Sequence, residues 1–241
     1  MEIRPIAYIH TDFPEKFGVP RQSGLAKTLH GRIVFEKEYR NPDALRGLEG
    51  FSHLWLIWEF SANRRSADGL PAKLPSAKAV KESWQPTVRP PRLGGNAHMG
   101  VFATRSPFRP NPLGLSCVRI AGIDLNSPDG PVIDVLGADL MDGTPIYDIK
   151  PYIRYADARP EAVCGYVDGL KERELKVVLP SELSAGITDK SIIPALIETL
   201  QLDPRPSYHD DPDREYGMSF AGYNIRFKVI GVILTVTDVQ P

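Results

Sequence analysis

The chain has 241 residues, of which 42% are hydrophobic and 24% charged, and its formal net charge at pH 7 is −1. This composition indicates a globular chain long enough for one large domain or two unequal ones, and it excludes a wholly disordered chain. A net charge near zero argues against a protein that coats nucleic acid through its overall field, so any RNA binding must come from local basic patches.

Short runs rich in Val, Ile and aromatic residues alternate with turn signals along residues 1–157. This pattern predicts a mainly β first domain rather than alternating βαβ units. The 23 prolines, about twice the typical share of roughly 5%, agree with a loop-rich β architecture. Residues 51–60 are almost continuously apolar and predict a strand buried on both faces. The predicted strands cover residues 3–10, 32–37, 54–60, 115–123 and 132–140.

Residues 61–83 form a basic segment, with five Lys or Arg against two acidic residues and hence a charge of +3. Together with the arginines that follow, it predicts a basic face over 64–109, although ordinary solvated surface is equally consistent with the segment by itself.

Residues 84–116 contain six prolines, four glycines and no acidic residue. The fixed φ of proline and the permissive backbone of glycine exclude a long helix. We expect rigid loops that present arginines to a planar or anionic ligand, such as a phosphate or a carboxylate. A proline-rich linker is the alternative, but linkers seldom carry large apolar side chains such as Trp84 and Phe108. The arginines are Arg89, Arg92, Arg105 and Arg109.

A small α+β domain is predicted over residues 158–241. Ser191 is expected to cap a helix over 191–202, with Pro194 in its first turn and an apolar stripe typical of core packing. Strands are predicted over 170–179, 224–227 and 229–239.

Several familiar site motifs are missing. None of the 20 glycines lies two residues from another, so the G-x-G-x-x-G loop of Rossmann folds is absent. The P-loop pattern is also absent, and the five histidines lack metal-ligand spacing, so we expect no metal. Cys117 and Cys164 are outside C-x-x-C spacing, which favours reduced thiols. No apolar run approaches the roughly 20 residues of a membrane span, and the N-terminus lacks a signal-peptide core, so we expect a cytoplasmic protein.

Five motifs together resemble the TsaA-like family, and within it the bacterial TrmO proteins. The motifs are FGVPRQSG (17–24), RGLEGFSHLW (46–55), GVFATRSPFRPNPLGLS (100–116), DLMDGTPIYDIKPYI (139–153) and DPRPSY (203–208). The resemblance covers about residues 6–157 and 200–228, and in comparison with shorter members of the family the basic segment 61–83 looks like an insertion in the first domain. It implies an S-adenosylmethionine-dependent methyltransferase acting on N6 of threonylcarbamoyladenosine at position 37, beside the anticodon of threonine tRNA. It also implies a non-Rossmann β-barrel that binds the cofactor at a homodimer interface.

The resemblance places cofactor contacts in four of these motifs. We expect Arg105 or Arg21 at the methionine carboxylate of the cofactor, and Asp139 or Asp142 at its ribose or amino group. The alternatives are a structural bond from Arg105 to loop carbonyls and a core position for His53. The full set of cofactor candidates is Pro20, Arg21, Gln22, His53, Leu54, Arg105, Leu115, Asp139, Leu140, Met141 and Asp142.

A general base is expected because the ureido N6 is a poor nucleophile until its proton leaves. Asp142, Tyr147 and Asp148 lie in the matched phrase 139–153 and are the hypothesised catalytic residues. An equally consistent alternative is that the two aspartates cap the turn around residues 143–145.

An anticodon loop offers unstacked bases, and the modified nucleotide carries a carboxylate, so recognition calls for aromatic stacking and arginine pairing. Trp84 and Phe108 are candidates for stacking, although we expect at least one of them in the core. The candidate RNA contacts are Arg89, Arg92, Arg109, Arg205, Tyr208, Asn224 and Arg226.

Two other functions fit the same loops. One is a non-enzymatic regulator that binds S-adenosylmethionine or RNA, and the other is a methyltransferase acting on a small molecule. The basic segment 61–83 and the C-terminal motif favour tRNA.

Overall fold

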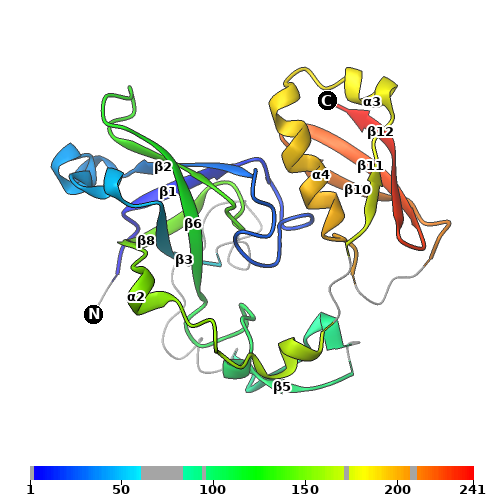
Figure 1. Cartoon of the computed structure of the whole chain (residues 1–241), viewed down its shortest axis with the longest axis horizontal. Coiled ribbons are helices and arrows are strands. Elements are labelled where there is room, and N and C mark those ends of the chain that lie inside the picture. The colour runs from blue at the N-terminus through cyan, green and yellow to red at the C-terminus, as the bar shows by residue number, and fades with distance from the viewer. Residues whose placement is uncertain (1–2, 61–83, 94–95, 171–173, 207–210) are drawn as a thin grey trace.

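The computed structural model describes residues 3–60, 84–93, 96–170, 174–206 and 211–241. Within these ranges the chain forms a closed six-stranded barrel, a four-stranded sheet with short helices, and a two-stranded ribbon (Figure 1). The predicted mainly β architecture is therefore confirmed, with a non-Rossmann barrel and a smaller α+β part. The basic segment 61–83 lies outside the described residues.

The barrel closes in the order β1-β2-β7-β6-β3-β8, and each neighbouring pair is antiparallel. Alternate residues of each strand point into the barrel, as the two-residue period of a strand requires, so Ile9, Ile33 and Ile133 are fully buried. The strands are β1 (Ala7–Thr11), β2 (His30–Phe35), β3 (His53–Glu59), β6 (Leu113–Asp124), β7 (Val132–Leu136) and β8 (Thr144–Pro151).

The predicted double burial of residues 51–60 is wrong. In β3 the side chains of Leu54, Leu56 and Trp58 fill the barrel, whereas Trp55 is only partly buried on its outer face and Phe51, just before the strand, is 40% exposed. A closed barrel has a single interior, so each strand has only one face to bury completely. The outer face is partly covered by the short helix α2 (Arg154–Asp157), where the Trp55 indole donates to Asp157 at 3.1 Å.

The described part of 84–116 contains no long helix, as expected. It forms the ribbon of β4 (Thr87–Val88) and β5 (Met99–Gly100), with two single 3-10 turns. The expectation that Trp84 or Phe108 lies in the core is wrong. Trp84 is partly buried and stacks on the 72% exposed Phe102, and Phe108 is 60% exposed. A two-stranded ribbon offers no second layer to bury them.

The C-terminal part is a sheet in the order β10-β11-β12-β9, in which β9 and β12 are parallel. The predicted break near residue 228 is wrong, since β11 continues to Ile230 and the chain turns at Gly231, whose φ is 61°. Strand β10 was not predicted. The elements are β9 (Lys176–Val178), α3 (Ser181–Ala185), α4 (Ile193–Gln201), β10 (Tyr216–Phe220), β11 (Tyr223–Ile230) and β12 (Ile233–Gln240).

Helix α4 is shorter than predicted because a 3-10 turn (Lys190–Ile192) precedes it. The predicted cap at Ser191 is wrong. Asp189 accepts hydrogen bonds from both the amide and the hydroxyl of Ser191, at 2.9 and 2.6 Å. The apolar stripe does pack into the core, where Leu196 and Leu200 are fully buried.

The core of the C-terminal part also includes residues from the loop that joins β1 and β2. Phe13, Ala26 and Leu29 pack in this cluster, and the Phe13 ring meets Phe220 at 5.2 Å between centroids. Figure 1 shows this loop reaching from the barrel toward α4 and β10. The two parts therefore share apolar surface, while the division of the chain at residue 157 stays a prediction.

Gly114 on β6 makes room for the Trp58 ring, because a Cβ there would lie 2.2 Å from Trp58 Cε2. We expect Gly114→Ala to lower the free energy of unfolding by about 1–3 kcal/mol through overpacking. The matched control is Gly122→Ala on the same strand, where an added Cβ meets nothing within 4 Å. Chemical denaturation of both variants checks this; equal stability of the two would contradict it.

Candidate functional site

A chain of hydrogen bonds connects the barrel interior to the turn after β7. The Trp58 indole donates to Ser116 Oγ at 2.9 Å, and Ser116 Oγ donates to Asp139 Oδ1 at 2.5 Å. Trp58 and Ser116 come from the paired strands β3 and β6, and both side chains are buried. The position of the Asp139 carboxylate is therefore fixed by residues that pack the barrel.

Burial raises the pKa of Asp139 above its ordinary value, because removal from water disfavours the carboxylate. The hydrogen bonds from Ser116 and from main-chain groups, and the positive charge of Arg105, act in the opposite direction. A partly buried carboxylate near a guanidinium suits a ligand that donates hydrogen bonds and also carries a negative group.

Arg105, in the loop before β6, donates to the side-chain oxygen of Gln22. Gln22 in turn donates to the main-chain oxygen of Arg21 at 2.5 Å. The alternative for Arg105 was a structural bond to loop carbonyls. In the structure it is Arg109 that makes such bonds, donating to Thr104 O at 3.0 Å and to Ser106 O at 3.2 Å. The predicted residues Gln22, Arg105 and Asp139 and the main chain of Arg21 therefore come together at one end of the barrel. The Arg21 guanidinium points away from them and donates to the carbonyls of Asp203 and Arg205 at 3.4 and 3.5 Å.

The other cofactor candidates lie elsewhere. Leu54 and Leu140 are buried in the barrel core, which leaves only their main chains for a ligand. Leu115 points outward from β6 and is 57% exposed, and Pro20 is buried in the β1–β2 loop. His53 is half-buried on the outer face of β3, where its Nδ1 lies 2.9 Å from Ser52 Oγ, so it is not a core histidine.

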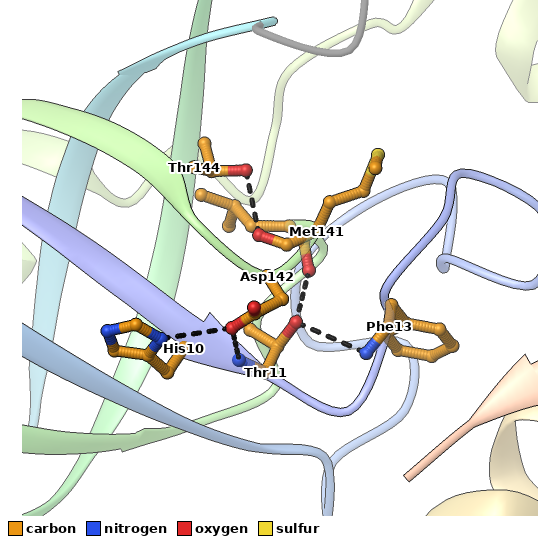
Figure 2. A network of polar contacts seen from close by, with 7 residues as sticks. His10, Thr11, Phe13, Met141, Asp142 and Thr144 are labelled. Carbon is orange, nitrogen blue, oxygen red and sulfur yellow. Dashed lines mark hydrogen bonds and ion pairs between the residues drawn. The ribbon is translucent and has the colours of Figure 1, made fainter. Parts of the chain in front are cut away.

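Asp142 and Met141 belong to the turn that leads into β8 (Figure 2). The exposed Asp142 carboxylate accepts from the Thr11 amide at 3.2 Å and lies 3.1 Å from His10 Nδ1. The Met141 carbonyl accepts from the Thr144 hydroxyl at 2.8 Å. These contacts fasten the turn to the end of β1, and the described residues show no bond from the Asp142 carboxylate to the amides of residues 143–145.

Tyr147 and Asp148 lie on β8. The Tyr147 hydroxyl donates to the buried Glu59 at 2.5 Å, which holds the phenol in a donor role. Asp148 forms an ion pair with Lys150 at 2.9 Å and also accepts from the Ile149 amide. Of the three hypothesised bases, Asp142 and Asp148 are the two carboxylates with partial solvent access.

The candidate RNA contacts divide by exposure. Arg92 is exposed, and Arg89 is exposed with its Nε 3.0 Å from His98 Nε2. Arg205 is only 4% exposed and forms a two-point ion pair with Asp203 at 2.8 and 2.9 Å, so it stabilises the chain after α4. Asn224 and Arg226 are exposed on the face of β11 opposite the core, and Tyr208 lies outside the described residues.

Ser116 and Trp58 were missed as site residues. Ser116 closes the matched block, and its inward direction follows from the strand period, but its contact with Asp139 depends on a register that the sequence does not reveal.

Two absences hold within the ranges the structure describes. No group of three or more His, Cys, Asp or Glu side chains is placed to hold a metal ion, and both cysteines are free. No helix there has the length and apolar character needed to cross a membrane.

Both parts of the chain match known protein-domain families. The tRNA-methyltransferase O N-terminal domain matches residues 8–158, and the TrmO C-terminal domain matches residues 172–241.

Full-length relatives and solved structures agree with this match. The chain is 36% identical to the tRNA (adenine(37)-N6)-methyltransferase of Escherichia coli, covering 100% of this chain and 98% of that protein. It is 37% identical to a putative S-adenosylmethionine-dependent methyltransferase, RcsF, of Pseudomonas aeruginosa, covering 90% and 87%. A crystal structure of TrmO from Pseudomonas aeruginosa superposes with a TM-score of 0.73 at 28% identity, covering 100% and 99%. The chain therefore belongs to the tRNA-methyltransferase O family.

Proposed function

We propose that the protein transfers a methyl group from S-adenosylmethionine to N6 of threonylcarbamoyladenosine at position 37 of threonine tRNA. The observation that carries the proposal is the Arg105–Gln22–Asp139 arrangement at the barrel end in a chain of this family. A relative matched across the full chain is named as a methyltransferase for adenine 37 of tRNA, and another is named as a putative S-adenosylmethionine-dependent methyltransferase.

The residues at the barrel end fit the cofactor. Of the two arginines expected at its carboxylate, Arg105 supplies the guanidinium group, because the Arg21 guanidinium donates to the carbonyls of Asp203 and Arg205 instead. The partly buried Asp139 accepts hydrogen bonds from hydroxyl or amino groups. When bound, the cofactor supplies an electrophilic methyl group on a sulfonium. Because Asp139 is held by Ser116, its carboxylate needs little reorganisation when a ligand binds.

The protein's remaining task is to orient N6 and accept its proton. Asp142 is our first choice for the base, because its exposed carboxylate follows Asp139 by three residues and is held in position by His10 Nδ1 at 3.1 Å. Asp148 is the second choice, because its carboxylate is already occupied by Lys150 at 2.9 Å and by the Ile149 amide. Tyr147 is the third, with its hydroxyl already donated to Glu59.

We further propose a homodimer in the cytoplasm. The outward-facing Leu113 and Leu115 of β6 are 38% and 57% exposed, as are Phe102 and Phe108 nearby in the chain at 72% and 60%. Exposed large apolar side chains of this kind favour burial against a partner. A second copy is the partner that the family resemblance implies.

The proposed activity predicts methyl transfer to threonine tRNA that carries the threonylcarbamoyl group and none to the same tRNA without it. Labelled S-adenosylmethionine and nucleoside mass analysis measure this. Cofactor binding without product on either tRNA would favour the regulator or a small-molecule acceptor.

The same assay separates the candidate bases. Asp142→Asn should lower turnover by roughly 100-fold or more with nearly unchanged cofactor affinity, since general bases contribute about 10²–10⁴-fold. Asp148→Asn is the control, with turnover close to wild type. Full activity of both variants would remove the two carboxylates as bases.

The raised pKa of Asp139 means that its ionised carboxylate lowers the stability of the folded protein, while the same carboxylate is proposed to bind the cofactor. The folded protein holds the Asp139 proton more tightly than the unfolded chain, so stability falls as pH rises above the ordinary value of 3.8. We expect Asp139→Asn to be more stable than wild type at pH 7, by a margin that shrinks toward pH 4, and to bind S-adenosylmethionine more weakly. Thermal unfolding across pH and calorimetric titration test this; parallel stability profiles would contradict it.

A homodimer predicts a solution mass of twice the 26.7 kDa chain. Leu113→Asp should shift the mass toward the monomer, because it would bury a charge in the interface. Leu125→Asp, at a 46% exposed position after β6, should not. Light scattering that finds only monomer for the wild type would eliminate the shared interface.

A further inference from the structure

A cavity of about 370 Å³ lies between the β1–β2 loop and the chain around the end of α4. Its volume is within the roughly 300–1,000 Å³ of small-molecule sites. One wall comes from residues 16–21 and the other from Thr199 and residues 202–204, so the two parts of the protein build it jointly. The apolar part of the lining includes Phe17, Val19 and Leu202.

Three polar groups of the lining lack the partners that their chemistry calls for. Thr199 is 1% exposed, and its buried hydroxyl has no hydrogen-bond partner among the described residues. Lys16 and Arg21 form no ion pair with any residue the structure describes, and Arg21 makes only two long hydrogen bonds, to the carbonyls of Asp203 and Arg205 at 3.4 and 3.5 Å. The nearby Asp203 carboxylate is already held by Arg205.

Arg21 has a second cation in its surroundings. Burial and the nearby charge of Arg92 lower the pKa of Arg21, and the Asp203 carboxylate, which is itself paired with Arg205, acts in the opposite direction. A buried unpaired hydroxyl costs free energy, and clustered cations repel each other, so both are explained by an anionic ligand that also offers hydrogen-bonding groups.

The cavity also adjoins the proposed cofactor site. Pro20 and Arg21 line it, and Gln22, the next residue, accepts from Arg105 and donates to the Arg21 carbonyl. A ligand in the cavity would therefore lie next to the methyl donor, which is the position that an acceptor group must take.

On the basis of the proposed function, we propose that this cavity holds the threonylcarbamoyl group of the acceptor nucleotide. The carboxylate of that group pairs with Arg21 and Lys16, its polar atoms bond the Thr199 hydroxyl, and its methyl group packs against Val19 and Leu202. The cavity then distinguishes modified adenosine from unmodified adenosine.

The test compares two anticodon stem-loops of threonine tRNA, with and without the threonylcarbamoyl group at position 37. Dissociation constants are measured by fluorescence anisotropy with the full chain. Wild type should prefer the modified RNA by roughly tenfold, since charge-assisted bonds to the extra group are added. Leu202→Trp, which fills the cavity, should bring the ratio close to one. Leu125→Trp is the matched control on the barrel and should keep the preference.

Thr199→Val replaces the hydroxyl by a methyl group of similar size. This variant keeps the proposal testable if the tryptophan variant does not fold. We expect it to raise the melting temperature of the free protein, because it removes a buried unsatisfied group, and to weaken binding of the modified stem-loop about threefold to tenfold. A purely structural threonine would instead lower the melting temperature on substitution and leave the RNA preference intact.

The outcomes separate the two proposals. If the wild type transfers the methyl group and both cavity variants keep the full preference for the modified stem-loop, the cavity assignment is overturned and the proposed activity is not. A wild-type protein that binds both stem-loops equally also overturns the cavity assignment. A wild type that prefers the modified stem-loop but methylates neither tRNA supports the cavity and overturns the proposed activity.

Discussion

The Trp58 indole couples the packing of the barrel to the candidate site. It fills the space that Gly114 leaves on the neighbouring strand, and its single donor fixes Ser116, which in turn fixes Asp139. Buried donors need partners, so the indole, the hydroxyl and the carboxylate form one unit. A change in the packing at Gly114 is therefore also a change in the position of the carboxylate.

The barrel is the rigid framework of the candidate site, and the loops at its end carry the charged and polar side chains. Arg105 comes from the proline-rich block, Gln22 from the β1–β2 loop and Asp139 from the turn after β7, so three separate segments meet. Prolines and turn contacts such as Thr11–Asp142 hold these segments in place without a glycine-rich nucleotide loop (Figure 2). This arrangement explains how a chain without Rossmann features can still present a cation beside a partly buried carboxylate.

The predicted strands match β2, β3 and β6 to within two residues at each end, where runs of aliphatic and aromatic residues stand out between turn signals. Strand β8 was missed because Pro145 and Pro151 at its ends and charges within it hide the pattern, and β10 because Gly217 interrupts a short run. Arg21, Gln22, Arg105 and Asp139 were predicted from family motifs. Ser116 and Thr199 were not, because their significance depends on strand register and on contact between the two parts, neither of which local pattern encodes.

The loop between β1 and β2 belongs to the barrel by sequence, yet Phe13, Ala26 and Leu29 pack in the core of the C-terminal part. Arg21 and Gln22 lie between these anchors, and the Thr28 amide is held by Glu198 of α4 at 2.8 Å. The loop is thus ordered before any ligand arrives, so association need not include the conformational entropy of folding it. The C-terminal part accordingly holds in place the loop that carries Arg21 and Gln22, which is a structural role separate from any contact with RNA.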